Sequence, residues 1–182
     1  NDAIEDGPAG WLVDYSKPIA NGPVTRGFDY FFGISASLDM IPYTFIEDGH
    51  VTITPALDMS LPMTAGRRKG QTRKGPGAEG FTAERVLPAL TEKAVEYIKK
   101  HSAAAKAGKP FFLYLPLASP HTPIAPSPAW AGKSGISPYA DFVMETDASL
   151  GTVLSAIDEG GVRDNTLVIF TSDNGCSPQA DY

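Results

Sequence analysis

Two apolar runs that end in polar loops place the strongest constraint on the fold of this chain. Thr166-Leu-Val-Ile-Phe-Thr171 leads directly into Ser172-Asp-Asn-Gly175, and Phe111-Phe-Leu-Tyr-Leu-Pro-Leu117 leads into Ser119-Pro-His-Thr-Pro123. Apolar runs without polar alternation are typical of strands that are covered on both faces, as in parallel sheets. We therefore predict two buried strands, at residues 111–117 and 166–171.

Helical periodicity appears in two segments. Residues 82–105 carry apolar residues at spacings of three and four, and so do residues 139–158, which end at Gly160-Gly161. Because the second segment lies between the two apolar runs, it predicts a β-α-β unit with parallel strands and a right-handed connection. His121 and Asp173 then follow strands that end at the same sheet edge, where open α/β sheets bind ligands.

A short hairpin is also predicted. The segments 43–46 and 50–53 flank Glu47-Asp48-Gly49, and Asp-Gly is a strong signal for a tight hairpin turn. The sequence thus favours the α/β fold class, with helices flanking a mostly parallel sheet.

The residues after the two runs indicate a chemistry. Asp173 and Asn174 offer two hard oxygen donors, which suit Ca²⁺ or Mg²⁺, although Asp-Asn-Gly on its own is usually a turn. Two donors cannot hold such an ion, so we expect further ligands outside this chain. His121 is either a structural histidine or an imidazole that binds an anionic oxygen or protonates a leaving group.

Composition excludes some partners. The chain is 42% hydrophobic and 20% charged, as in ordinary globular proteins, and its net charge of −6 argues against a nucleic-acid binder. No apolar stretch is long enough to span a bilayer. One local exception is the basic stretch 66–75, which is either a solvated loop or a basic lip that attracts an anionic substrate; its charged residues are Arg67, Arg68, Lys69, Arg73 and Lys74.

These motifs, taken in order, resemble a known family. The ordered set is Arg26-Gly-Phe-Asp-Tyr-Phe-Phe-Gly33, Ser119-Pro-His-Thr-Pro123, a helix with Asp147, and Thr171-Ser-Asp-Asn-Gly175. It is similar to the amino-terminal catalytic domain of the arylsulfatases, in the alkaline-phosphatase-like superfamily. The similarity covers nearly the whole chain and is weakest over 55–80. It leads us to expect that residues 1–182 are one partial catalytic domain, truncated at both ends.

The resemblance implies sulfate-ester hydrolysis at a Ca²⁺ site, with Ca²⁺ favoured over Mg²⁺. Asp173 and Asn174 match metal ligands, His121 matches the histidine that touches the sulfate or leaving-group oxygen, and Ser37 aligns with a serine near the substrate sulfate. Sulfated small molecules or sulfated glycans are the implied substrates. A secreted, periplasmic or lysosomal location is implied as well.

The chain also departs from the family pattern. Sulfatases carry a formylglycine, made by a maturation enzyme from Cys or Ser in a Cys/Ser-x-Pro-x-Arg motif, and that motif is absent from these 182 residues. Two further acidic metal ligands and a lysine are missing too, so we expect the isolated chain to be inactive. Cys176-Ser-Pro178-Gln-Ala180 has alanine where the arginine should stand, and we interpret Cys176 as an inert loop thiol.

Two alternatives stay open on the sequence alone. One is a phosphatase, phosphodiesterase or phosphonate hydrolase of the same superfamily, which the nucleophile and the number of metal ions would distinguish. The other is a non-catalytic module that binds sulfated glycans through residues 67–74, with strong salt dependence and no metal requirement.

Overall fold

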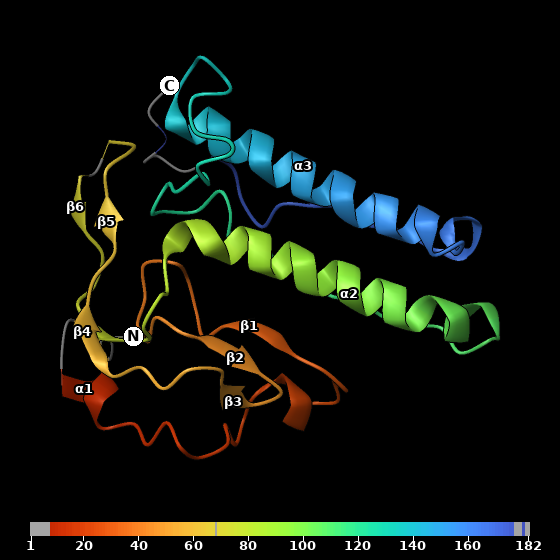
Figure 1. Cartoon of the computed structure of the whole chain (residues 1–182), viewed down its shortest axis with the longest axis horizontal. Helices are drawn as coiled ribbons and strands as arrows, with labels where there is room; N and C mark the ends of the chain where they lie inside the picture. Colours follow the sequence, from red (N-terminus) through yellow and green to blue (C-terminus); the bar gives the residue numbers. More distant parts are fainter. Residues whose placement is uncertain (1–7, 68, 177–179, 181–182) are drawn as a thin grey trace.

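Two long helices lie side by side, and small antiparallel sheets lie below and beside them in the computed structural model (Figure 1). The structure describes residues 8–67, 69–176 and 180. The helices are α2 (Val86–Lys106) and α3 (Pro138–Glu159). The α/β class predicted from the sequence is confirmed.

Both long helices begin and end close to where the periodicity predicts. α3 starts after Ser137, whose Oγ accepts a hydrogen bond from the Ala140 backbone N–H at 3.2 Å, and Pro138 occupies the first turn, where its missing N–H costs nothing. α3 ends at Gly160-Gly161, and Gly161 has a φ of +65°, which glycine adopts without strain. α2 is preceded by the short 3₁₀ helix η2 (Ala83–Arg85).

The predicted hairpin is confirmed. β2 (Phe45–Glu47) and β3 (His50–Val51) pair antiparallel, with Glu47 opposite His50. Asp48 and Gly49 form the two-residue turn, and both have positive φ, as a type I′ turn requires. β1 (Phe32–Ile34) adds a third strand on the other side of β2.

The remaining elements are short. Two further antiparallel pairs form, β4 with β7 and β5 with β6. The bounds are α1 Pro8–Trp11, η1 Pro23–Thr25, β4 Leu57–Met59, β5 Pro62–Met63, β6 Gly70–Gln71, β7 Gly75–Gly77 and η3 Arg163–Asn165. Apolar side chains form two buried clusters. One lies between the small sheets and the first turns of the helices, and the other between the later turns of α2 and α3.

The prediction of two buried strands is wrong in its burial and pairing. Residues 111–117 and 166–171 form no ladder within the described part of the chain. Phe111, Leu113 and Leu115 pack against the α2–α3 cluster, but Phe112 is 74% exposed. Leu167 is 85% exposed. A strand covered on both faces needs neighbouring strands and a second covering layer, and the described residues supply neither for these two segments.

The two segments nevertheless start near one another. Phe111 and Phe112 line the same groove as Leu167 and Ile169, at the C-terminal ends of α2 and α3. The connection through α3 therefore brings the start of residues 166–171 back beside the start of residues 111–117. This agrees with the predicted direction of the β-α-β connection, although no ladder joins the two segments among the residues that the structure describes.

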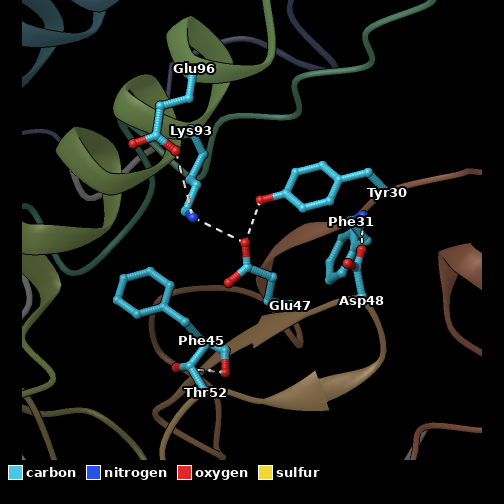
Figure 2. Close-up of polar contacts among 8 residues, drawn as sticks. All are labelled: Tyr30, Phe31, Phe45, Glu47, Asp48, Thr52, Lys93 and Glu96. Carbon is cyan, nitrogen blue, oxygen red and sulfur yellow. Dashed lines mark hydrogen bonds and ion pairs between the residues drawn. The ribbon is translucent and has the colours of Figure 1, made fainter. Parts of the chain in front are cut away.

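A charged hydrogen-bond network ties the hairpin to α2 (Figure 2). Glu47 Oε1 accepts from the Tyr30 hydroxyl at 2.6 Å and from Lys93 Nζ at 3.0 Å, and Lys93 also pairs with Glu96 at 3.6 Å. The Tyr30 hydrogen bond, followed by that of Lys93, holds the pKa of Glu47 below its ordinary value. Burial, with the Glu47 contact, raises the pKa of Tyr30. The ionised carboxylate and the neutral phenol thus favour each other.

We expect the Glu47→Gln variant to unfold about 1 kcal/mol more easily at pH 7, because the charged acceptor is lost while the site stays partly hydrated. A carboxylate with a depressed pKa contributes stability above its unfolded pKa, near 4.5, and loses that contribution as the pH falls through its folded pKa. The difference between the two proteins should therefore shrink below about pH 4. Urea unfolding at several pH values measures it.

Glu92→Gln is the matched control, since Glu92 also lies on the surface and pairs with Arg85 at a looser 3.9 Å. Its expected effect is within about 0.5 kcal/mol of zero. Equal destabilisation by both substitutions would contradict the role given to the Glu47 network.

Candidate functional site

The structure brings together two of the four site residues predicted from the sequence. Ser37 lies in the loop after β1, and His121 lies in the loop after residues 111–117. Ser37 Oγ is 3.0 Å from His121 Nδ1, although the two residues are 84 positions apart. The His121 side chain is exposed and Ser37 is partly buried, so a ligand can reach the pair from solvent.

Backbone geometry determines which nitrogen of His121 carries a hydrogen. Nδ1 lies 2.7 Å from the Thr122 carbonyl oxygen, which can only accept a hydrogen bond. Nδ1 is therefore the protonated nitrogen of the neutral ring, and Nε2 is the nitrogen left for a ligand. Ser37 Oγ accepts from the same N–H, which leaves the serine hydroxyl hydrogen free to be donated elsewhere. When Nε2 also carries a hydrogen, the Nε2–H and the Ser37 hydroxyl can both donate to one anion.

Asp173 and Asn174 lie together in an exposed turn that follows residues 166–171. With its amide nitrogen toward the carboxylate, Asn174 donates to Asp173 Oδ1 at 2.7 Å. The Ser172 hydroxyl closes the turn by donating to the Asn174 carbonyl at 2.6 Å. Carboxylate and amide oxygens suit a hard divalent cation, so the donor chemistry fits Ca²⁺.

The described residues do not complete a metal site. Across 8–67, 69–176 and 180, no group of three or more His, Cys, Asp or Glu side chains converges. No hydrogen bond among these residues joins the Asp173–Asn174 pair to the Ser37–His121 pair. The two pairs are thus separate among the described residues, and the contact between them stays a prediction.

Two polar groups near the Ser37–His121 pair were not predicted from the sequence. The Thr122 carbonyl is a backbone group, so no residue pattern marks its role. Asp39 lies two residues after Ser37 and has a carboxylate oxygen, Oδ1, that is buried without a hydrogen-bond partner among the described residues. A Ser-x-Asp spacing in a loop near a predicted site was the available signal for it.

Two buried carboxylates on α3 are structural. Asp141 accepts from the backbone N–H groups of Gly132 and Ser134, both at 2.7 Å, and hydrogen bonds from Ser134 and then Gly132 hold its pKa below the ordinary value. Glu145 accepts from the Ser127 N–H at 2.8 Å. These bonds tie the loop that follows His121 to α3, which explains how an irregular segment keeps a defined path.

Cys176 is exposed, as expected of a loop thiol. Residues 177–179 of the Cys-x-Pro-x-Ala sequence lie outside the described residues. None of the helices among the described residues has the length and apolar character needed to cross a membrane.

Comparison with known proteins matches this chain to one family. The family model described as Sulfatase matches residues 8–181. An N-acetylgalactosamine-6-O-sulfatase of Bacteroides thetaiotaomicron is 31% identical over 93% of this chain and 38% of its own length. Human arylsulfatase A is 39% identical over 91% of this chain and 32% of its own length.

A solved structure gives the same answer. It comes from work on the metabolism of multiple glycosaminoglycans by Bacteroides thetaiotaomicron, and it aligns with a TM-score of 0.71 at 26% identity. The alignment covers 94% of this chain and 42% of that one. The chain therefore spans about two fifths or less of the length of these relatives, and it has the alkaline-phosphatase-like fold class. Because the family model covers nearly all of its residues, the chain belongs to the sulfatase family.

Proposed function

We propose that this chain is part of an enzyme that hydrolyses sulfate esters. The observation that carries the proposal is the sulfatase family match over residues 8–181. The contact between Ser37 and His121 supports it, because two residues that resemble sulfate-contacting groups of the family lie 3.0 Å apart. An anion-binding pair on two loops is what a sulfate-ester site requires.

His121 and Ser37 have separate roles in this proposal. In its imidazolium form, with a hydrogen on both ring nitrogens, His121 would donate Nε2–H to the bridging oxygen of the ester and pass that proton to the leaving group as the ester bond to sulfur breaks. Ser37 would donate its hydroxyl hydrogen to a non-bridging sulfate oxygen. The Thr122 carbonyl keeps the ring oriented, since it holds Nδ1–H.

Asp173 and Asn174 would hold Ca²⁺, together with acidic ligands from outside residues 1–182. When bound, the cation supplies positive charge that stabilises the sulfate group as charge develops on it. A formylglycine nucleophile, made by a maturation enzyme, is the family expectation, and its Cys/Ser-x-Pro-x-Arg motif is absent from residues 1–182. The Asn174 amide must turn its oxygen toward the ion, which breaks its bond to Asp173.

We further propose that residues 1–182 are a part of one larger catalytic domain. The exposed apolar side chains of Phe112, Tyr114, Leu167 and Ile169 support this, because such a surface is expected to be covered in the complete domain. Additional strands beside 111–117 and 166–171 would give these segments the ladder that they lack here.

The proposed substrates are sulfated glycans or sulfated small molecules. The names of two relatives, an N-acetylgalactosamine-6-O-sulfatase and an arylsulfatase, support both classes. A secreted, periplasmic or lysosomal location accompanies this proposal, as the resemblance to the family implies.

The test is turnover of 4-nitrophenyl sulfate and 4-nitrophenyl phosphate by the longer protein that contains residues 1–182. We expect sulfate release to exceed phosphate release, to disappear on chelation, and to return with added Ca²⁺. Residues 1–182 alone should release neither product. Preferential phosphate release would instead favour a phosphatase of the same superfamily, and full activity after chelation would contradict the metal role.

A further inference from the structure

The hairpin formed by β5 and β6 is rich in positively charged residues. β5 and β6 pair through Pro62 with Gln71 and Met63 with Gly70, and residues 61–74 are called the basic hairpin below. Between residues 54 and 78 the sequence holds five Lys or Arg and one acid, Asp58, within a chain of net charge −6. Figure 1 shows β5 and β6 at one edge of the molecule.

The basic hairpin has an apolar side and a charged side. Leu61, Met63 and Ala65 are buried, at 3%, 9% and 8% exposure. Arg67 and Lys69 are exposed, and Lys69 Nζ is held by the Thr64 carbonyl at 2.7 Å. The buried side fixes the hairpin to the protein, so Arg67 and Lys69 lie on a defined surface.

A buried tyrosine connects this hairpin to the Ser37 loop. Tyr43 is 1% exposed, and its hydroxyl lies 2.6 Å from Thr72 Oγ1 and 2.5 Å from the Arg73 carbonyl. The same hydroxyl lies 3.4 Å from the Asp39 carbonyl, two residues after Ser37. Two residues span at most about 7 Å, so the base of the hairpin is tied close to the Ser37–His121 pair.

Packing supports the same placement. Leu61 and Ala65 of the hairpin belong to one buried cluster with Leu38, which follows Ser37, and Ile124, which lies three residues after His121. The hairpin and both site loops therefore share a core. A ligand held at Ser37 and His121 would have the charged side of the hairpin as a neighbouring surface.

We propose that the basic hairpin is a second anion subsite, which binds a further sulfate or carboxylate of the same anionic polysaccharide chain. This rests on the proposed sulfatase function, because it assumes that Ser37 and His121 hold the reacting sulfate. Arg67 supplies a planar guanidinium that can pair with two oxygens of one anionic group, and Lys69 adds a point charge. Clustered cations on an otherwise acidic protein also raise the local concentration of an anionic chain.

The experiment compares two double variants of the longer enzyme. Arg67→Ala with Lys69→Ala removes two charges from the hairpin, and Lys100→Ala with Lys109→Ala removes two from the exposed C-terminal end of α2 and the segment after it. KM is measured for a chondroitin sulfate oligosaccharide and for 4-nitrophenyl sulfate over a range of salt concentrations. We expect the hairpin variant to raise KM for the oligosaccharide about tenfold and to flatten its salt dependence, with 4-nitrophenyl sulfate turnover unchanged.

Several outcomes overturn the subsite. Equal KM and salt dependence in the two variants would do so. Inhibition of the unmodified enzyme by single-stranded DNA that is as strong as inhibition by a chondroitin sulfate chain of the same charge would also do so, because the hairpin would then not select a polysaccharide. If the unmodified enzyme releases no sulfate, the proposed function fails separately. Calorimetric titration with the same oligosaccharide then decides the subsite: weaker binding by the hairpin variant alone supports it, and equal binding overturns it.

Discussion

Replacing His121 by Ala should lower kcat of the longer enzyme by about 10²- to 10⁴-fold, which is the usual contribution of a positioned acid–base group. Because His121 binds through Nε2 and no metal ligand is changed, the Ca²⁺ content should stay the same. Sulfate release under saturating substrate and metal analysis of the purified protein measure both quantities.

The ring geometry also predicts which replacement retains more activity. Thr122 and Ser37 occupy Nδ1, so the reacting nitrogen is Nε2. Gln places its amide nitrogen near the Nε2 position, whereas Asn places it nearer Nδ1. We expect His121→Gln to bind substrate better than His121→Asn, with both lacking the protonation step. Loss of Ca²⁺ in proportion to loss of turnover would show that His121 supports the metal instead.

Replacing Asp173 by Ala should remove both metal binding and activity. The carboxylate is the one charged donor in the Asp173–Asn174 pair, and an amide oxygen alone cannot balance a divalent charge. We expect Ca²⁺ affinity to fall by about a hundredfold or more, with sulfate release falling to background, since removing even an outer-shell partner of a metal ligand costs about 10- to 100-fold. Calorimetric Ca²⁺ titration of the longer protein gives the affinity.

Asp164→Ala is the control for this change. Asp164 is an exposed acid in η3, nine residues before Asp173, so its loss changes the net charge equally. It should leave Ca²⁺ affinity and turnover unaltered. If both variants lose Ca²⁺ equally, the effect is general electrostatics and Asp173 is not a ligand.

The elements with local sequence signals were predictable. α3 is marked by Ser137 and Pro138 at its start and by glycines at its end, and the β2–β3 hairpin is marked by Asp48-Gly49. In each case the residues that form the element also carry its hydrogen bonds, so neighbouring positions in the sequence contain the information.

Features that depend on distant partners were not predictable in the same way. Residues 111–117 have the composition of a buried strand, but Phe112 and Tyr114 are exposed because burial depends on elements that the described residues lack. The Tyr43 hydroxyl joins Asp39 to the base of the basic hairpin through two backbone carbonyls and one threonine, and no motif marks such a contact.

The candidate site falls between these cases. Asp-Asn-Gly after an apolar run indicated the oxygen donors, and Ser-Pro-His-Thr-Pro indicated His121. The 3.0 Å contact of Ser37 with His121 follows from the packing of Leu38 and Ile124 into one cluster, which the sequence does not show.

In the proposed site, Asp173 and Asn174 bind one cation, and His121 and Ser37 bind the sulfate that this cation holds. A crystal structure of the longer protein, grown with Ca²⁺ and a sulfate ester, tests it most directly. We expect one Ca²⁺ about 2.3–2.6 Å from oxygens of Asp173 and Asn174, with the same sulfate in hydrogen-bond contact with Nε2 of His121 and the Ser37 hydroxyl. A cation or sulfate bound at one pair of residues, with the other pair out of its reach, would contradict it.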